Sequence, residues 1–168
     1  MDLKETWLIA IADPALMSRK WEAEIARHPN EPNWPLWKAA NLERLAQGRI
    51  LPYYGIRNGE IICEATAMLS EKDVQNPEGL VDESTVYLAA FRTAEKFQGK
   101  GYFSRLFRFM EQDLKARGYS KLTLGVEAED TKNRSLYSHL EFREWIKSAR
   151  ERWPDGTEIA VDYYGKTL

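Results

Sequence analysis

The sequence predicts a single mixed α/β domain spanning residues 1–168. Its 168 residues are enough for one domain with a core, and no linker-like or repetitive segment divides them. Hydrophobic residues make up 43% and charged residues 30%, as in soluble globular proteins. The expected elements follow the order β-α-α-β-β-β-α-β-α-β-β. Three consecutive strands in the middle argue against a doubly wound nucleotide-binding fold.

The N-terminal part begins with a short strand and a helix. Residues 7–12 are apolar and carry alternating isoleucines, which predicts a strand. Asp13 followed by Pro14 is a typical helix start, with the aspartate as N-cap and the proline at the first helical position. We expect this helix to end at Pro29.

A second helix and a hairpin follow. We expect the helix to open at Pro35 and to stop before Gly48, which suits a position just past a helix end. Residues 50–57 and 60–69 then flank an Asn-Gly dipeptide at 58–59. Asn-Gly between two β-rich segments is the strongest short-range hairpin signal.

The second half alternates strands and helices. Residues 85–93 are almost all apolar and predict a central strand covered on both faces. An amphipathic helix is expected over 102–117, stopped by Gly118, and a strand over 121–126. A short helix at 131–140 and strands at 142–150 and 158–164, joined by a turn at 154–156, complete the chain.

Bulk composition excludes several partners. Lys plus Arg is 24 and Asp plus Glu is 26, so a net charge of -2 gives no electrostatic case for nucleic acid. Cys63 is the single cysteine, so no intrachain disulfide can form and a reducing compartment is expected. No signal pattern and no membrane-length apolar segment is present. We therefore expect a cytoplasmic protein without a membrane partner.

The stretch Gln98–Phe103 stands between the central strand and the long helix. Gly99 and Gly101 let the backbone approach a ligand, and the free amides of the first helical turn point at an anion. A dinucleotide fold would need a third glycine where Ser104 stands, and a P-loop would need Gly-Lys-Ser or Gly-Lys-Thr. Glycines that serve only a tight turn are the alternative to an anion site.

With its surroundings, this stretch resembles the signature of the GNAT superfamily of N-acetyltransferases. The signature has Arg or Gln, two residues, Gly, one residue, then Gly or Ala. Gln98 and Gly101 match it, whereas Phe103 stands where Gly or Ala is usual. The resemblance implies a central, mostly antiparallel sheet of about seven strands, splayed between the fourth and fifth, with helices on both faces.

The resemblance also implies acetyl-CoA as acyl donor. The amides from Gly99 to Ser104 would bind its pyrophosphate, and backbone groups of residues 91–93 would pair with its pantetheine arm. The expected cofactor-binding residues are Phe91, Arg92, Thr93, Gln98, Gly99, Lys100, Gly101, Tyr102, Phe103 and Ser104, together with Asp130 and Asn133 on the pantetheine side.

A second family motif lies in the short helix. Tyr137 and Phe142 match its end, while Asp130 and Asn133 replace the usual Asn and Ala. Glu141 stands where Gly is usual, which predicts either a left-handed non-glycine residue or a rearranged helix end.

Catalysis is assigned first to Tyr137. The resemblance places this tyrosine near the acyl sulfur, where a phenol with a pKa near 10 can protonate the leaving thiolate. Glu64 on the hairpin, Glu127 at the end of a strand, or a water relay could serve as general base. His28 and His139 have no metal-ligand partner at useful spacing, so no metal is expected.

The acceptor is expected to be a primary amine of a small molecule or peptide. Aromatic faces attract ammonium groups, and Trp34, Trp37, Tyr53 and Tyr54 come from segments that shape the acceptor side in the family. Core packing is the alternative role, and we expect it for at least two of the four. A non-catalytic acyl-CoA sensor, another acyl group and a hydroxyl acceptor are alternatives. A homodimer stays an open alternative for the assembly.

Overall fold

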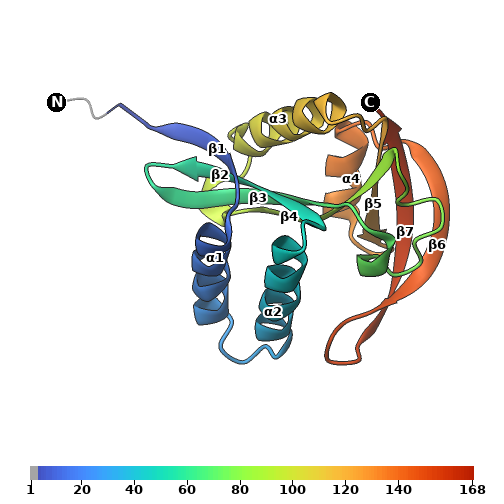
Figure 1. Cartoon of the computed structure of the whole chain (residues 1–168), viewed down its shortest axis with the longest axis horizontal. Coiled ribbons are helices and arrows are strands. Elements are labelled where there is room, and N and C mark those ends of the chain that lie inside the picture. The colour runs from blue at the N-terminus through green and yellow to red at the C-terminus, as the bar shows by residue number, and fades with distance from the viewer. Residues whose placement is uncertain (1–3) are drawn as a thin grey trace.

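The computed structural model describes residues 4–168 as one seven-stranded sheet covered by four α-helices (Figure 1). The strands are β1 (Trp7–Ile11), β2 (Ile50–Arg57), β3 (Glu60–Met68), β4 (Thr85–Thr93), β5 (Lys121–Glu127), β6 (Glu144–Arg152) and β7 (Glu158–Thr167). The helices are α1 (Pro14–Arg27), α2 (Asn33–Ala46), α3 (Tyr102–Ala116) and α4 (Thr131–His139), and short 3₁₀ turns occupy Glu71–Asp73 and Glu95–Phe97. The sheet order is β1-β2-β3-β4-β5-β7-β6, with β4 and β5 as its parallel pair. The predicted fold class is confirmed.

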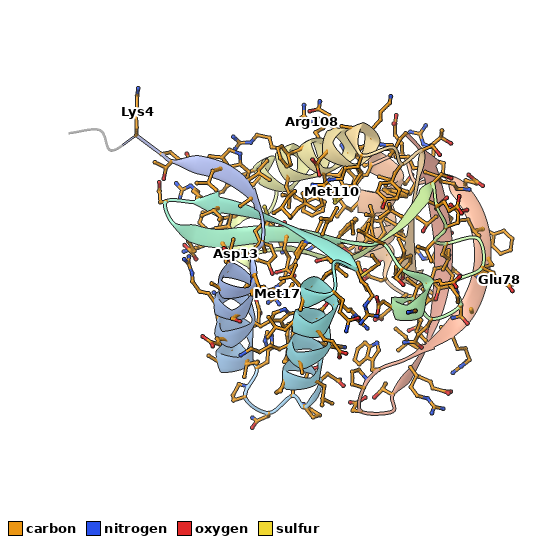
Figure 2. The ribbon with its side chains drawn as sticks, in the orientation of Figure 1. Lys4, Asp13, Met17, Glu78, Arg108 and Met110 are labelled. Atoms are coloured by element: carbon orange, nitrogen blue, oxygen red, sulfur yellow. The ribbon has the colours of Figure 1, made fainter. Side chains whose placement is uncertain are left out.

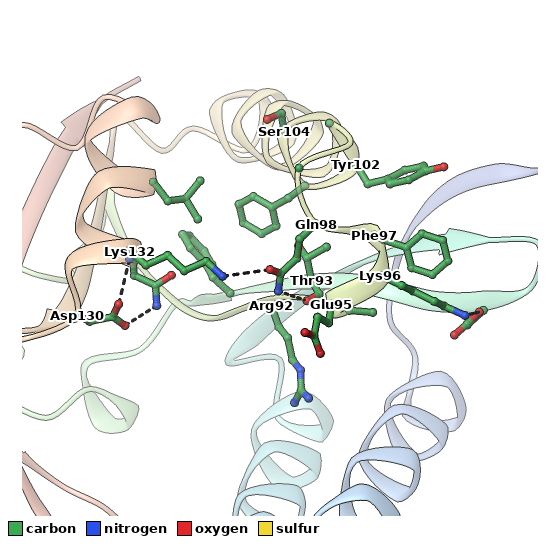
Figure 3. Close-up of a pocket in the computed structure, with 18 of the residues that line it drawn as sticks. Arg92, Thr93, Glu95, Lys96, Phe97, Gln98, Tyr102, Ser104, Asp130 and Lys132 are labelled. Atoms are coloured by element: carbon green, nitrogen blue, oxygen red, sulfur yellow. Dashed lines mark hydrogen bonds and ion pairs between the residues drawn. The ribbon is translucent and has the colours of Figure 1, made fainter.

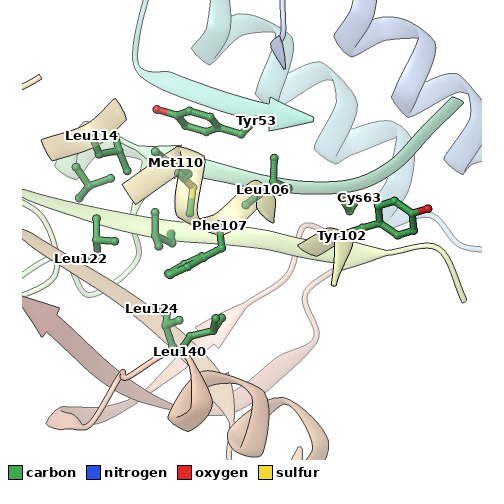
Figure 4. Close-up of a cluster of buried hydrophobic side chains, with 14 of the residues drawn as sticks. Tyr53, Cys63, Tyr102, Leu106, Phe107, Met110, Leu114, Leu122, Leu124 and Leu140 are labelled. Carbon is green, nitrogen blue, oxygen red and sulfur yellow. The ribbon is translucent and has the colours of Figure 1, made fainter. Parts of the chain in front are cut away.

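Helices cover both faces of the sheet, as expected. Helices α1 and α2 lie against one face, and α3 lies against the other (Figure 1). The spacing of Leu106, Met110 and Leu114 on α3 buries one helix face completely in the core shown in Figure 4. Met17 of α1 belongs to a second core on the opposite face, as its position relative to Met110 in Figure 2 shows.

The N-terminal helices largely follow their sequence signals. Asp13 caps α1 by accepting a hydrogen bond of 2.8 Å from the amide of Leu16. The prediction that Pro35 opens the second helix is wrong, because α2 already begins at Asn33. Pro35 instead lies in the first turn, where a proline removes only an N–H that has no helical partner.

The predicted hairpin is confirmed. Asn58 and Gly59 both have positive φ angles, +48° and +78°, as a two-residue turn between twisted strands requires. The turn brings Glu60 opposite Arg57 and sets the register of β2 and β3.

Strand β4 carries the irregularity that shapes the site. It pairs with β5 only from Thr85 to Leu88, and beyond that point the two strands separate. Ala90 has a φ of +57°, and the register with β3 shifts there, which marks a bulge. Pairing with β3 resumes at Arg92 and Thr93. The predicted splay between the fourth and fifth strands is therefore confirmed.

The C-terminal end differs in detail from the prediction. Strand β6 begins at Glu144, because Phe142 is buried in the α3 core and its amide donates to the carbonyl of Tyr137 at the end of α4. Glu141 has a φ of +73°, so the left-handed alternative is the correct one. Strand β7 is longer than predicted and inserts between β5 and β6.

Candidate active site

A large cavity opens where β4 separates from β5. Its volume is about 1300 Å³, and it is bounded by the end of β4, the N-terminus of α3 and the start of α4 (Figure 3). We call it the donor cavity. Every residue expected to bind the cofactor lines this cavity except Lys100, whose ammonium group lies 6.0 Å from the ring centre of Phe97.

The N-terminus of α3 presents free backbone amides from Gly99 to Ser104, which we call the amide cradle. Gly99 and Gly101 have φ angles of +73° and +84°, and a β-carbon at either would meet only open space. Within residues 4–168, none of the amides from Gly99 to Ser104 has an acceptor, and Arg105 is the first to donate, to Gly101. These groups and the positive end of the α3 dipole suit an anion such as a pyrophosphate.

Side chains join the two walls of the donor cavity. The Gln98 amide donates to the carbonyl of Thr93 at 3.1 Å, and the Lys132 ammonium donates to the Gln98 side-chain oxygen at 3.1 Å (Figure 3). Lys132 thus adds a positive charge that the motif did not indicate. The sequence places Lys132 in the first turn of the predicted short helix. Only the fold brings that turn next to Gln98.

Asp130 and Asn133 have a structural role as well as a place on the wall. Asp130 is the N-cap of α4, and it accepts hydrogen bonds from the backbone amide of Asn133 at 3.0 Å and from its side chain at 2.6 Å. Both residues line the donor cavity. Their pairing fixes the start of the helix that carries Tyr137.

Tyr137 lies on α4 with its ring 5.5 Å from that of Phe91. The ring centre of Phe91 lies 5.3 Å from that of Phe103. Phe103, which stands where the family signature has Gly or Ala, therefore supports the contact between Phe91 and Tyr137. Burial, with a smaller contribution from Asp130, raises the pKa of Tyr137 to about 12. The phenol therefore stays protonated near neutral pH and can donate a proton.

A second cavity of about 540 Å³, the acceptor cavity, lies on the α1 and α2 side of the sheet. It shares Phe91 and Arg92 with the donor cavity. A chain of indole contacts forms much of its wall, with ring centres 5.4 to 5.9 Å apart. In order, the chain is Trp21, Trp34, Trp37 and Trp153.

Three of the four aromatic residues expected at the acceptor side do line this cavity. They are Trp34, Trp37 and Tyr54. Tyr53 does not, because alternation along β2 turns it to the opposite face, where its hydroxyl donates to Asp113 of α3 at 2.5 Å. Tyr53 is therefore a core residue, which is the alternative role expected for some of these aromatic residues, and Trp153 on the β6–β7 connection was missed.

The carboxylates predicted as general bases have different surroundings. Glu64 is buried in the acceptor-cavity wall and forms an ion pair of 2.7 Å with Lys20. Burial raises the pKa of Glu64, and the charge of Lys20 opposes that rise. Glu127 is exposed at the end of β5 and belongs to the wall of neither cavity.

The acceptor cavity also contains a carboxylate that the sequence did not single out. Glu151 of β6 accepts hydrogen bonds from the hydroxyls of Tyr163 at 2.5 Å and Tyr87 at 3.4 Å. No periodicity or motif marks this residue. It reaches the cavity because β6 and β7 form a long hairpin that extends past the sheet toward α2 (Figure 1).

The remaining candidate groups are structural. Cys63 is buried, and burial raises the pKa of its thiol to about 12, so it is an inert core residue. His28 stacks on Trp34 with ring centres 4.4 Å apart. Over residues 4–168, no group of three or more His, Cys, Asp or Glu side chains could hold a metal ion. No helix in this range is long and apolar enough to cross a membrane.

Solved structures share this fold across nearly the whole chain. The ribosomal-protein-alanine N-acetyltransferase from Brucella melitensis matches with a TM-score of 0.68 and 16% identity, covering 96% of this chain and 99% of that one. The yncA protein from Salmonella typhimurium, solved with its cofactor acetyl-CoA, gives 0.65 and 15%, covering 96% and 94%. NAA60 from Arabidopsis thaliana, in complex with a bisubstrate analogue, gives 0.69 and 13%, covering 97% and 99%.

The sequence comparisons complete the assignment. No curated protein sequence matches this chain significantly. The family model described as Acetyltransferase (GNAT) family matches residues 14–142, a range that includes the α1–α2 pair, the splayed strands, the amide cradle and Tyr137. The chain belongs to the GNAT acetyltransferase family.

Proposed function

We propose that this protein transfers the acetyl group of acetyl-CoA to a primary amine of a small molecule or peptide. The observation that carries the proposal is that two cavities share Phe91 and Arg92, beside the bulge of β4. One cavity has an anion cradle, and the other has aromatic walls. An acyl donor and an acceptor could meet at this junction.

The donor cavity supplies matching groups for each part of acetyl-CoA. The amides from Gly99 to Ser104 would bind the pyrophosphate, and Lys132 would add a positive charge beside it. Beyond Leu88, β4 has no partner on its β5 side, so its backbone can pair with an extended pantetheine arm.

Tyr137 is the proposed proton donor to the leaving group, supported by its contact with Phe91, which lines both cavities, and by its protonated hydroxyl. The amine nitrogen would attack the thioester carbonyl, a C–N bond would form and the C–S bond would break. The departing thiolate would take the hydroxyl proton of Tyr137, a group that is protonated near neutral pH. Solvent would then return a proton to the phenolate.

Release of free thiol from acetyl-CoA across a panel of amines tests the proposal. Tyr137→Phe should lower turnover about 10-fold or more, because it removes the proton donor, while leaving acetyl-CoA affinity nearly unchanged. Tyr137 is itself part of neither cavity wall, but its ring contacts Phe91, which lines both cavities. Tyr119→Phe is the matched control, since Tyr119 lies beyond the far end of α3.

Three results would contradict parts of this proposal. Unchanged turnover in Tyr137→Phe would remove Tyr137 from the mechanism. Binding of acetyl-CoA without thiol release for any amine would favour a non-catalytic sensor. Failure to bind acetyl-CoA would reject the assignment of the donor cavity.

A further inference from the structure

Glu151 is the one carboxylate in the described wall of the acceptor cavity without a cationic partner. The other two are paired: Glu64 with Lys20 at 2.7 Å, and Asp73 with Arg44 at 3.0 Å and Arg49 at 2.6 Å. Glu151 forms no ion pair with any residue from 4 to 168. Its negative charge is therefore available to a ligand.

Each basic side chain of the same wall has a carboxylate partner. The four ion pairs span 2.6 to 3.0 Å and are Lys20–Glu64, Arg44–Asp73, Arg92–Glu24 and Arg152–Glu158. Among residues 4–168, the wall thus has a carboxylate without a cationic partner but no basic side chain without a carboxylate partner, which favours a cationic ligand over an anionic or zwitterionic one.

Two tyrosines hold Glu151 in place. Tyr87 of β4 and Tyr163 of β7 donate to the same oxygen, Oε2, so the other oxygen faces no protein donor among the residues described. Burial raises the pKa of both hydroxyls, so they stay protonated and act as donors. Gly125 of β5 leaves room for them, because a β-carbon there would lie 2.9 Å from the Tyr87 hydroxyl. Four strands, β4 to β7, thus hold the carboxylate in place and leave one of its oxygens free.

The carboxylate lies in the aromatic wall of the acceptor cavity, and the same cavity reaches the junction at Phe91. Tyr87 precedes Phe91 by four residues on β4, and both line the acceptor cavity. The contacting indoles of Trp34, Trp37 and Trp153 form a broad aromatic surface in the same cavity. Such surfaces bind flat apolar groups and cations.

We infer that Glu151 binds the amino group of the acceptor, and that the acceptor is a small primary amine with an aromatic or other apolar body and no carboxylate beside the amine. This inference rests on the proposed function. A cavity of about 540 Å³ suits a small molecule. Before the attack, the bound ammonium gives one proton to the free oxygen of Glu151, which passes it to water and leaves a neutral amine. As the C–N bond forms and the C–S bond breaks, nitrogen loses a second proton by the same route, and the departing thiolate takes the proton of Tyr137. Glu151 is then the general base, in place of Glu64 and Glu127.

The test uses 2-phenylethylamine as probe and has two readouts. Tryptophan fluorescence reports binding in the acceptor cavity whether or not turnover occurs, and thiol release from acetyl-CoA reports transfer. Wild type should show a saturable fluorescence change with the amine and a much weaker one with 2-phenylethanol or phenylalanine. Glu151→Gln should weaken amine binding about 10-fold or more, as expected for a hydrogen bond to a charged group.

Two further variants keep the test interpretable. Glu144→Gln removes another β6 carboxylate, one that pairs with Lys121 and lines neither cavity, and should leave binding unchanged. Tyr163→Phe removes one donor to Glu151 and should weaken amine binding about threefold, as loss of a modest hydrogen bond predicts. It provides a second reading if Glu151→Gln does not fold.

The outcomes separate this inference from the proposed function. Equal amine affinity in wild type and Glu151→Gln would overturn the inference, and so would binding of phenylalanine as tight as that of the amine. Thiol release with peptides but neither binding nor release with 2-phenylethylamine would overturn it while supporting acetyl transfer. Amine binding that depends on Glu151, without thiol release, would support the amine site and reject the proposed reaction.

Discussion

The donor and acceptor cavities are built from different parts of the chain. The donor cavity relies on backbone: a run of free amides between Gly99 and Ser104 and the unpaired edge of β4. The acceptor cavity relies on side chains from α1, α2, β3, β4 and the β6–β7 hairpin. A backbone site depends on local conformation, and a side-chain site depends on how distant elements pack. The two should therefore respond to different substitutions.

The largest expected effect is a loss of folding stability caused by a substitution in the acceptor-cavity wall. Lys20→Met should lower the free energy of unfolding by about 3–5 kcal/mol, because it leaves the buried carboxylate of Glu64 without its partner. Urea denaturation measures this change. The double variant Lys20→Met/Glu64→Leu should recover much of the loss, since no buried charge is left unpaired.

The variants of Lys20 and Glu64 also test whether the two cavities are independent. Acetyl-CoA affinity of the folded double variant should equal that of wild type, because neither residue lines the donor cavity. A double variant that remained as unstable as Lys20→Met would show that packing, and not the unpaired charge, causes the loss.

An intermediate effect, on acetyl-CoA affinity, is expected from a substitution in the donor cavity. Gly101→Ala should weaken acetyl-CoA binding about 10-fold or more, because its φ of +84° disfavours a side chain and the open space beside it belongs to the amide cradle. Calorimetric titration with acetyl-CoA gives the change in affinity.

Gly48→Ala is the matched control for this prediction. Gly48 also has a positive φ, +69°, and open space around its β-carbon position, but it lies at the end of α2, away from both cavities. Both variants should lose about 1–2 kcal/mol of stability from backbone strain. Equal acetyl-CoA affinities in the two variants would contradict the cradle assignment.

The smallest effect is expected where the α1–α2 loop meets the β6–β7 turn. The side chain of Asn33, which is only 1% exposed, donates to the Asp155 carboxylate at 3.1 Å and accepts from the Asp155 amide at 3.0 Å. These bonds fasten the Trp153 side of the acceptor cavity to the start of α2. Asn33→Ala should raise the KM for the amine about threefold and leave the KM for acetyl-CoA unchanged.

The charge on Asp155 gives this link a defined pH range. The amide of Thr157 is the main cause that holds the pKa of Asp155 below 3.8, and Asn33 contributes less. The carboxylate is thus charged, and the link intact, above pH 4; it is lost as the pH falls through the lowered pKa. Any difference in amine KM between wild type and Asn33→Ala should therefore be constant from pH 6 to 9, and a strong pH dependence there would contradict the assignment.

Much of the donor side could be predicted from the sequence, because its determinants are local. Gln98 and Gly101 stand between a strand and a helix whose patterns are clear, and free amides at the start of α3 follow from the helix itself. The left-handed Glu141 could be anticipated from the position it occupies. Lys132 could not, since its contact with Gln98 spans separate elements.

The acceptor side could be predicted only in part. Trp34 and Trp37 were expected there, but the face of β2 occupied by Tyr53 depended on strand alternation and on which side each helix covers. Trp153 and Glu151 were missed because β7 inserts between β5 and β6 and so directs the hairpin toward α2. Strand order depends on long-range pairing, which no local pattern encodes.

The sequence by itself determined the fold class, most element boundaries and the free amides at the start of α3, because helix caps, Asn-Gly turns and apolar spacing act over a few residues. Only the tertiary structure decided which carboxylate stands free in the acceptor cavity. Glu64, Asp73 and Glu151 are chemically similar in the sequence, yet packing gives Lys20 to the first, two arginines to the second and two tyrosine hydroxyls to the third. A charged side chain is available to a ligand when no opposite charge in the protein pairs with it. Whether such a partner is present depends on contacts between residues far apart in the chain.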